Sequence, residues 1–465
     1  MLSLWRKTVK IKNTMENLKS NRRDFFKTSA LGVLGTVSMP AILGSCSGNA
    51  SNEAKVKDVI IPDFFEEAPD GKPLKAGLVG CGGRGTGAAQ NFLDAGNGLQ
   101  ITALGDVFPD KLEACRKTLK DQGHEVADQN CFTGFDAYKK VIDSDIDIVL
   151  LATPPLFRPE HFDYAVSKGK HCFIEKPAAV DPTGIRQVLV TSKKASQAGL
   201  TVVTGTCLRS SKTIIETYKR VAQGDIGEIV SAHVTRLGGA LWFKKREPGW
   251  SDMEYLLRNW VSFCRASGDC VVEMLVHEID LMTWFLGDKL PIRAESTGGR
   301  QRRVTGDMYD HFSMTYIYEN GMRAHCTQRQ IDGCNDAMGV FIYGTKGYAD
   351  PRSSKIFNKD GSIMWEAPSR KRGDPPQPKA YNIMVQEHIR LVNAIRTGNP
   401  INEADKLAYS TLIAIMGRES AYTGKFITWD EAMASTLKLS LDNYEMGPIP
   451  GFNEDIPLAG TAPVV

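Results

Sequence analysis

The feature that most constrains this chain is a short apolar run that breaks into glycines. Residues 74–79 are mostly apolar, and the chain continues as Gly80-Cys81-Gly82-Gly83-Arg84-Gly85 before a helix-compatible run. Glycines at this spacing allow a tight turn, a close approach of the backbone to a pyrophosphate, and close packing of helix on strand. The N–H groups of the helix N-terminus then face the anion. The pattern predicts a phosphate-binding turn, and the alternative is an ordinary glycine-rich turn in a chain with 43 glycines.

A second apolar run supports the first interpretation. Residues 99–104 are followed by Gly105-Asp106, about twenty residues after the glycine turn, where a dinucleotide fold places the acid that holds the ribose hydroxyls. Asp106 favours NAD because its charge repels a 2′-phosphate, whereas Arg84 within the turn could offset that repulsion. The sequence therefore predicts a dinucleotide site that contains Gly80, Gly82, Gly83, Arg84, Gly85 and Asp106, with NAD as the cofactor and NADP left open.

Composition narrows the class of partner. The chain has 465 residues, 42% of them hydrophobic, and a formal net charge of +3 without a long basic block after the N-terminal segment. This balance argues against a nucleic-acid surface and favours a small-molecule substrate. The ten cysteines show neither zinc-ligand spacing nor a dense disulfide pattern, so we expect no metal.

The N-terminal segment is predicted to be a targeting signal rather than part of the folded domains. Asn21 to Lys27 looks like a twin-arginine export motif, an apolar segment follows, and Leu43-Gly44-Ser45-Cys46 resembles a bacterial lipobox. We expect a signal over residues 1–46, a polar tether over 47–73, and a periplasmic protein or a lipoprotein anchored at Cys46. A plain cleaved signal and a cytosolic chain are the alternatives, and the start codon is Met1 or Met15.

Export has a consequence for the cofactor. Twin-arginine routes carry folded proteins, and a nicotinamide dinucleotide is not expected to be freely available outside the cytoplasm. The cofactor would therefore be tightly bound and would be regenerated in place.

The segment 74–205 alternates as βαβ units should. The apolar run Ile146 to Ala152 ends in Thr153-Pro154, and the run His171 to Ile174 ends in Glu175-Lys176-Pro177. Because parallel strands deliver their carboxyl ends to one edge of the sheet, Thr153, Pro154, Glu175 and Lys176 are predicted to line the cofactor site. A lysine there can bind a sugar hydroxyl or relay a proton, although a solvent-facing loop lysine is the simpler alternative.

With the glycine turn, Asp106 and Glu175-Lys176-Pro177 in this order, the sequence resembles the Gfo/Idh/MocA family of nicotinamide-dependent oxidoreductases over residues 74–430. The Glu-Lys-Pro tripeptide is characteristic of that family. The resemblance implies an α/β chain with an N-terminal Rossmann dinucleotide-binding domain, 74–205, and a C-terminal α+β domain, 206–445, with a predominantly antiparallel open sheet. We also expect a homo-oligomer and an extended tail over 446–465.

The second domain carries an aromatic and basic insert over residues 241–260. Aromatic faces with interleaved polar groups suit a sugar ring, so Trp260 and Arg258 are predicted to contact the substrate. The alternative is a small satellite core that packs the insert on the sheet.

Farther along, Asn320-Gly321 predicts a hairpin turn between two strands.

Glu273, His277 and Asp280 are spaced four and three residues apart, which predicts one helix face with two acids and an imidazole. The family resemblance implies that His277 is the general base, that Lys176 polarises or relays, and that Glu273 orients, with Asp280 near the substrate. The commoner family pattern has aspartate at position 273 and glycine at 275. The alternative is a partly buried His277 paired with Asp280.

Three functions follow. The first is hydride transfer between NAD(P) and a secondary hydroxyl of a sugar, glycoside or cyclitol. The second is NAD-dependent glycoside hydrolysis through transient oxidation at C3, elimination and return of the hydride. The third is a lipoprotein that binds sugars without turnover.

Overall fold

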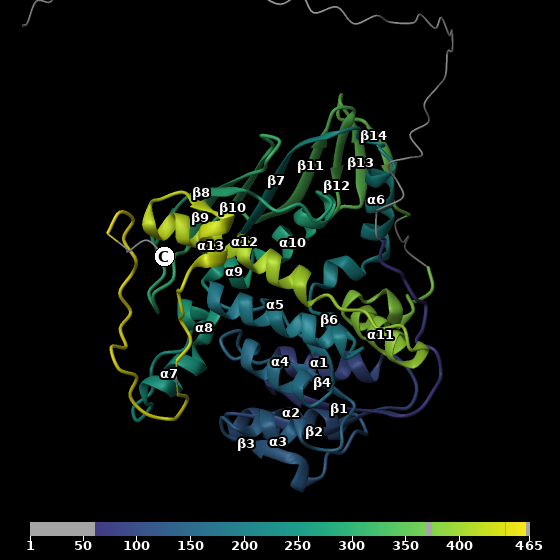
Figure 1. The fold of residues 1–465 in the computed structure, drawn as a ribbon, viewed down its shortest axis with the longest axis vertical. Coiled ribbons are helices and arrows are strands. Elements are labelled where there is room, and N and C mark those ends of the chain that lie inside the picture. Colours follow the sequence, from purple (N-terminus) through teal and green to yellow (C-terminus); the bar gives the residue numbers. More distant parts are fainter. Residues whose placement is uncertain (1–60, 369–373, 442, 462–465) are drawn as a thin grey trace, which may run out of the picture. The chain divides into compact units, whose positions relative to one another are not determined.

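In the computed structural model the described residues are 61–368, 374–441 and 443–461. They contain two sheets of different topology (Figure 1). The predicted export motif, the lipobox with Cys46 and residues 47–60 lie outside the described residues. Within the described residues, no helix has the length and apolar character needed to cross a membrane.

The first sheet is parallel, with strand order β3-β2-β1-β4-β5-β6. Its strands are β1 (Leu74–Val79), β2 (Leu99–Asp106), β3 (Cys131–Thr133), β4 (Ile148–Leu151), β5 (His171–Ile174) and β6 (Val202–Thr204). The connecting helices are α1 (Gly83–Leu93), α2 (Pro109–Asp121), α3 (Ala137–Ile142), α4 (Arg158–Ser167) and α5 (Pro182–Gln197). This is the predicted Rossmann topology.

Strand β4 shows why this sheet is buried. All four of its residues are buried, and successive side chains enter different cores. Ile148 and Leu150 pack with residues of α1, α2 and α11 (Ile383–Thr397), whereas Val149 and Leu151 pack with residues of α3, α4 and α5. A parallel strand covered on both faces has to be apolar throughout, which its sequence is.

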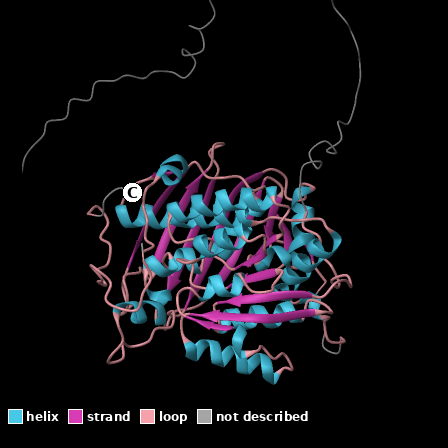
Figure 2. Cartoon of the chain, turned by 60° about the horizontal axis from the view of Figure 1, so that its bottom comes forward, coloured by secondary structure: helices cyan, strands magenta, loops and turns pink. Residues whose placement is uncertain are grey.

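The second sheet has the order β14-β13-β12-β11-β7-β10-β9-β8-β15. Figure 2 shows helices that lie across strands of the molecule. Only the β7–β10 pair is parallel among the described pairings of this second sheet, so the predicted antiparallel character is confirmed. Its strands are β7 (Ile229–Gly238), β8 (Arg293–Gly299), β9 (His311–Ile317), β10 (Arg323–Gln330), β11 (Ala337–Gly344), β12 (Gly347–Asp350), β13 (Lys355–Asn358), β14 (Ile363–Glu366) and β15 (Ile427–Thr428). Asn320-Gly321 forms the predicted turn between β9 and β10.

One face of this sheet packs on helices and the other is only half-buried. In β10, Ala324, Cys326 and Gln328 are buried, while the residues between them are intermediate. The helices of this part of the chain are α6 (Lys212–Ala222), α7 (Asp252–Arg258), α8 (Cys264–Ser267), α9 (Cys270–Glu273), α10 (Val276–Phe285), α12 (Ala404–Thr423) and α13 (Trp429–Ala434). Short 3₁₀ turns lie at Asp128–Asn130, Cys207–Ser210, Trp260–Ser262 and Lys379–Tyr381.

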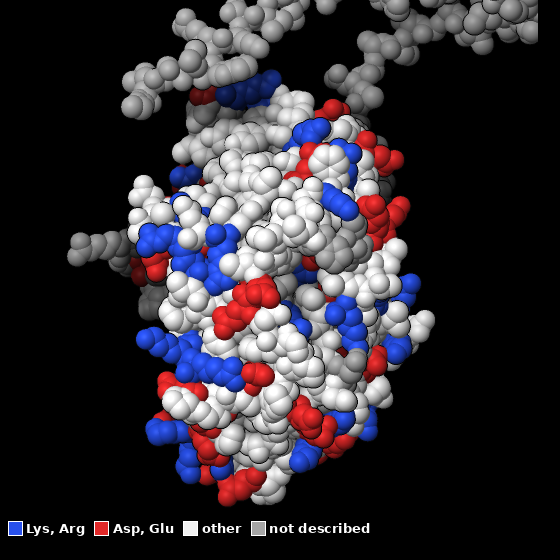
Figure 3. All heavy atoms as spheres, turned by 90° about the vertical axis from the view of Figure 1, so that its left-hand side faces the viewer, with Lys and Arg blue, Asp and Glu red and all other residues white. Residues whose placement is uncertain are grey.

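The insert packs in a separate hydrophobic core that it shares with other parts of the chain. Buried residues of α7 pack with Phe108 and Phe157 of the first domain and with Ile449 of the C-terminal segment. The alternative expected from the sequence had placed this packing on the antiparallel sheet, whose described strands contribute no residue to this core. On the side of the molecule shown in Figure 3, basic and acidic side chains are interspersed, as the small net charge predicts.

Two expectations differ from the structure. The described part of the predicted tether, residues 61–73, packs against α11, where Gln386 Nε2 donates to the Phe65 carbonyl at 2.7 Å and Arg396 to the Pro69 carbonyl at 2.7 Å. The single helix face expected for Glu273, His277 and Asp280 is also wrong, because α9 ends at Glu273 and α10 begins at Val276.

Candidate active site and dinucleotide pocket

The glycine turn joins β1 to α1, and each glycine meets a distinct constraint. Gly80 has φ +95°, and a Cβ there would lie 2.7 Å from the backbone of Ala152 and Thr153. A Cβ on Gly85 would lie 1.7 Å from the Gly80 carbonyl oxygen, so only glycine lets α1 pack this closely on the turn. A Cβ on Gly82 or Gly83 would meet no protein atom within 4 Å. These two positions leave the backbone open to a ligand.

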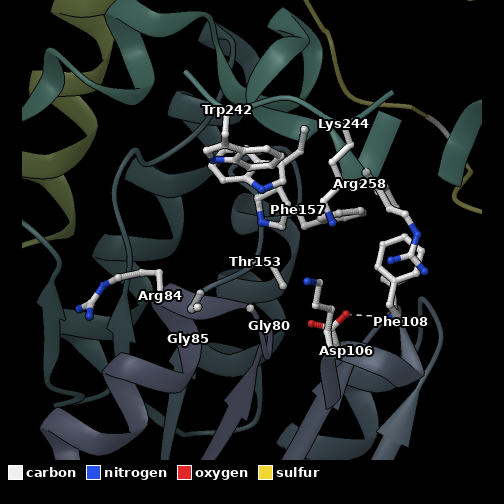
Figure 4. Close-up of a pocket in the computed structure, with 18 residues that line it drawn as sticks. Gly80, Arg84, Gly85, Asp106, Phe108, Thr153, Phe157, Trp242, Lys244 and Arg258 are labelled. Atoms are coloured by element: carbon white, nitrogen blue, oxygen red, sulfur yellow. Dashed lines mark hydrogen bonds between the residues drawn. The ribbon is translucent and has the colours of Figure 1, made fainter. Parts of the chain in front are cut away.

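Asp106 lies at the end of β2, beside this turn. Its carboxylate accepts the Cys81 N–H at 2.7 Å and the Phe108 N–H at 2.8 Å, and Asp106 lines the pocket (Figure 4). Burial raises the pKa of Asp106, and the two N–H donors oppose that rise. Each carboxylate oxygen accepts one backbone hydrogen bond and keeps a further lone pair for a ribose hydroxyl.

Arg84 points away from Asp106 (Figure 4) and forms an ion pair with Glu175. The sequence had allowed Arg84 to neutralise a 2′-phosphate near Asp106. The guanidinium is committed to the loop after β5 instead, so it does not weaken the preference for NAD that Asp106 creates.

Thr153 and Pro154 follow β4 and line the same pocket. Sequence reasoning missed the residue behind them. Arg158, 2% exposed at the start of α4, donates to the carbonyls of Thr153 and Pro177. Burial lowers the pKa of Arg158 to about 10. The one signal in the sequence was an arginine shortly after Pro154-Pro155, and arginines there are usually exposed.

Lys176 and Glu273 meet although 97 positions separate them. Lys176 Nζ donates to Glu273 Oε1 at 2.6 Å and to the Glu273 carbonyl oxygen at 2.7 Å. In a continuous helix that carbonyl would accept the His277 N–H, whereas here it accepts the lysine at the point where α9 ends. Burial raises the pKa of Glu273, and the charge of Lys176 opposes the rise. Glu273 Oε2 is buried and has no partner among the described residues.

His277 is half-buried in the first turn of α10. Burial, and then the positive charge of Lys176, lowers the pKa of His277 well below its usual value, with further contributions from Arg236 and Arg352. The imidazole is therefore neutral near pH 7 and free to accept a proton. Lys176, Glu273 and His277 form one cluster at the carboxyl edge of the parallel sheet, called the Lys176 cluster below.

The neighbouring acids have other partners. Glu278 is buried and accepts from Arg236 at 2.8 and 2.9 Å and from Arg352 at 2.9 Å, three residues that the sequence analysis did not select. Asp280, expected near the substrate and alternatively paired with His277, is 1% exposed and binds the Arg209 guanidinium at 2.8 and 3.0 Å. The structure thus places Asp280 in a buried ion pair rather than on an open face.

The pocket of about 500 Å³ lies between the glycine turn and the insert. It is also lined by Trp242, Lys244, Arg258 and Trp260. Figure 4 shows Trp242 and Lys244 across the pocket from Gly80 and Asp106. Trp260 and Arg258, expected to contact a sugar, therefore lie on the dinucleotide pocket. Among the described residues, no group of three or more histidine, cysteine, aspartate or glutamate side chains could hold a metal ion.

The glycine turn, the placement of Asp106 and the parallel sheet define a two-domain α/β protein with a nicotinamide dinucleotide site. Residues 74–204 match the oxidoreductase family with an NAD-binding Rossmann fold, and residues 214–350 match the GFO/IDH/MocA C-terminal domain. The chain belongs to the Gfo/Idh/MocA family of oxidoreductases, and its first domain is an NAD-binding Rossmann domain.

Relatives in this family differ in what they are named for. A glycosyl hydrolase family 109 protein of Shewanella pealeana is 25% identical over 49% of this chain and 48% of its own length. The chain thus spans about half the length of that curated relative. An uncharacterized oxidoreductase of Streptococcus pneumoniae is 26% identical over 71% of this chain and 89% of its own length.

Among solved structures, scyllo-inositol dehydrogenase from Lactobacillus casei with bound NAD(H) and scyllo-inositol has a TM-score of 0.57. It is 21% identical to this chain and covers 76% of it and 98% of its own length. At this identity the likeness establishes the fold.

Proposed function

We propose that this protein transfers a hydride between a tightly bound NAD and a secondary hydroxyl of a sugar, glycoside or cyclitol. The observation that carries the proposal is the Lys176 cluster, in which a lysine of the first domain is held at 2.6 Å by Glu273 of the second, beside a neutral His277. Neighbours in the fold include a dehydrogenase that was solved with scyllo-inositol.

The roles follow from charge. The substrate hydroxyl would donate its proton to His277, which is neutral because burial and Lys176 disfavour the imidazolium. Lys176 would bind the oxygen of that hydroxyl and stabilise the negative charge that develops there, while Glu273 keeps the ammonium in place. When bound, NAD supplies the acceptor for the hydride that leaves the same carbon. The NAD would be held by Gly82, Gly83, Asp106 and Thr153.

A second function has a specific observation in its favour. Relatives named as glycosyl hydrolase family 109 proteins match this chain. In that case His277 would take the hydroxyl proton while the hydride passes from C3 to NAD. Elimination would then break the glycosidic bond, water would add to the resulting double bond, and the hydride and the proton would return to C3 and its oxygen. The two functions share the Lys176 cluster and differ in whether the released product is oxidised.

The test is to purify the folded protein, denature it, and identify any released dinucleotide. We expect near-stoichiometric NAD or NADH. The protein is then supplied with a panel of sugars, cyclitols and aryl glycosides. A keto product supports the first function, and a free sugar with no net oxidation supports the second. Sugar binding without either product would support a non-catalytic protein and contradict both.

We also propose that the protein is exported through the twin-arginine route and held as a periplasmic lipoprotein at Cys46. The support is the Asn21 to Lys27 motif and the quartet that ends at Cys46. Radiolabelled palmitate incorporated into the wild-type chain, and lost with Cys46→Ala, is the expected result. Equal labelling of both chains would contradict it.

A further inference from the structure

The insert between β7 and α8 forms a wall of the dinucleotide pocket. The insert contributes Trp242, Lys244, Leu257, Arg258 and Trp260 to the pocket that the glycine turn and Asp106 also line. Figure 4 shows Trp242 and Lys244 across the pocket from Gly80 and Asp106. Phe108 and Lys111, which follow β2, line it as well. Because an acid at the end of β2 is positioned for a ribose, this part of the pocket corresponds to the adenosine end of a dinucleotide.

Arg258 joins the two walls. Its two terminal nitrogens donate to the carboxylate oxygens of Asp110 of the first domain, Nη1 at 3.2 Å and Nη2 at 3.1 Å, while Nε donates to Glu254 of its own helix at 2.8 Å. The same group lies 4.1 Å from the ring centroid of Phe108 and 5.4 Å from that of Trp250. One side chain thus connects α7 with the segment that follows β2, at the edge of the pocket (Figure 4).

The insert is also anchored from behind by the C-terminal segment. The Met253 N–H donates to the Gly447 carbonyl at 3.1 Å, and the Ile449 N–H donates to Asp252 at 3.1 Å. The segment is tied to the second domain in turn, since Glu454 accepts the Gly306 N–H at 2.6 Å. The insert is held to the second domain on one side, and Arg258 supplies its polar contact with the first domain on the other.

We propose that Arg258 is a latch that holds the insert over the adenosine end of the bound dinucleotide, so that the cofactor leaves only after the Arg258–Asp110 contact opens. Arg258 is then a cofactor-retaining residue rather than a substrate contact. This inference rests on the proposed function only in requiring that NAD or NADH bind in this pocket.

The experiment measures the release of NADH from the full chain. Protein loaded with NADH is mixed with a large excess of NAD, and the loss of energy transfer from tryptophan to NADH gives the release rate. Arg258→Met is expected to speed release about tenfold, because it removes a bidentate ion pair and a cation–π contact together. Asp110→Asn, which changes a residue outside the pocket lining, is expected to speed release about threefold.

Two comparisons make the test specific. The double variant is expected to release NADH no faster than Arg258→Met, because both changes break the same contact. Arg246→Met is the matched control, since Arg246 binds Asp252 within the insert and does not line the pocket. Its release rate is expected to stay within about twofold of wild type. Melting curves confirm that each variant is folded.

The outcomes separate the latch from the proposed function. Unchanged release in Asp110→Asn and Arg258→Met, equal acceleration in Arg246→Met, or multiplied effects in the double variant would overturn the latch. Slow NADH release that the variants accelerate, without turnover of any sugar, would support the latch and contradict the proposed function. A wild-type chain that binds no NADH would overturn both.

Discussion

The two walls of the dinucleotide pocket are built from different groups, backbone atoms in one and side chains in the other. The wall from the first domain is backbone, with Gly82 and Gly83 open to the ligand and Gly85 packed against the Gly80 carbonyl. The wall from the second domain is side chains, among them Trp242 and Arg258. A substitution in the backbone wall changes either the packing of the turn or its approach to the ligand, whereas a substitution in the side-chain wall changes only the contacts of that side chain. The comparison teaches that substitutions on the two walls should have different consequences for folding and for cofactor binding.

The largest effect is expected where the two domains meet at the Lys176 cluster. Lys176→Met should lower kcat for sugar oxidation about a thousandfold, since a positioned proton-transfer or charge-stabilising group contributes that much, while NADH release stays unchanged. Lys170→Met is the matched control, because Lys170 lies at the opposite end of β5 and binds the Ile146 carbonyl. Steady-state kinetics on both variants checks this. Retained kcat in Lys176→Met would remove the lysine from the chemistry.

Substitution of two glycines should divide the backbone wall into a packing part and a ligand part. Gly85→Ala places a methyl group 1.7 Å from a carbonyl oxygen and should cost about 3 kcal/mol of unfolding free energy or prevent folding. Gly82→Ala meets no protein atom, so its melting temperature should stay near wild type while NAD affinity falls about tenfold. Urea unfolding and calorimetric NAD titration distinguish them. A destabilised Gly82→Ala with normal NAD affinity would contradict this assignment.

The packing of α11 on the first domain should make the stability of the protein sensitive to acid. His388 of α11 is fully buried against Phe92 and Phe173, neither ring nitrogen has a partner among the described residues, and burial lowers its pKa to about 3. Histidine in the unfolded chain has its ordinary pKa of 6.5 and binds a proton more tightly than buried His388 does. The free energy of unfolding is therefore unaffected by this group above pH 6.5 and decreases as the pH falls from 6.5 toward 3. At pH 5 the loss is about 2 kcal/mol.

His388→Phe should remove that loss, because phenylalanine fills the same apolar site and does not titrate. The measurement is the urea-unfolding free energy at pH 7.5 and pH 5 for both chains. The difference between the two pH values should be smaller in His388→Phe by about 2 kcal/mol. An identical pH dependence in the two chains would show that His388 does not titrate in this range.

The smallest effect is expected at His277, in the Lys176 cluster. With burial and Lys176 lowering the pKa of His277, kcat/KM should be flat near neutrality and fall only below pH 6.5, as the imidazole takes up a proton. Arg352→Gln removes one of the positive charges and should move this acid limb upward by about 0.5 pH unit. A pH–rate profile at saturating cofactor checks it. An acid limb that stays in place, or moves to lower pH, would show that the charge of Arg352 does not lower the pKa of His277.

Much of the fold followed from local pattern. The strand predicted at 171–174 is β5, and the predicted Asn320-Gly321 turn joins β9 to β10, because apolar runs and turn residues are local signals. The strands β12 to β15 were not predicted. Each has two to four residues, and so short a strand is defined by the partner it pairs with rather than by its own sequence.

Of the residues in the candidate site, some were likewise predicted from local spacing and others were not. The glycine turn, Asp106 and the Glu175-Lys176-Pro177 tripeptide were read from spacing. Arg158, buried beneath two loops, was missed because arginine is most often exposed. Asp280 was expected near the substrate but lies in a buried ion pair with Arg209, because a spacing of three or four residues does not reveal the end of α9 at Glu273.

By itself the sequence determined the backbone wall of the pocket, since a turn without room for a Cβ requires glycine at particular spacings and leaves a legible motif. Only the tertiary structure decided that the insert closes the opposite wall, that Arg84 binds Glu175 rather than supporting a 2′-phosphate, and that Lys176 binds Glu273 where α9 ends. These contacts join residues far apart in the chain, and no local spacing encodes which distant side chain will reach a given carbonyl or carboxylate.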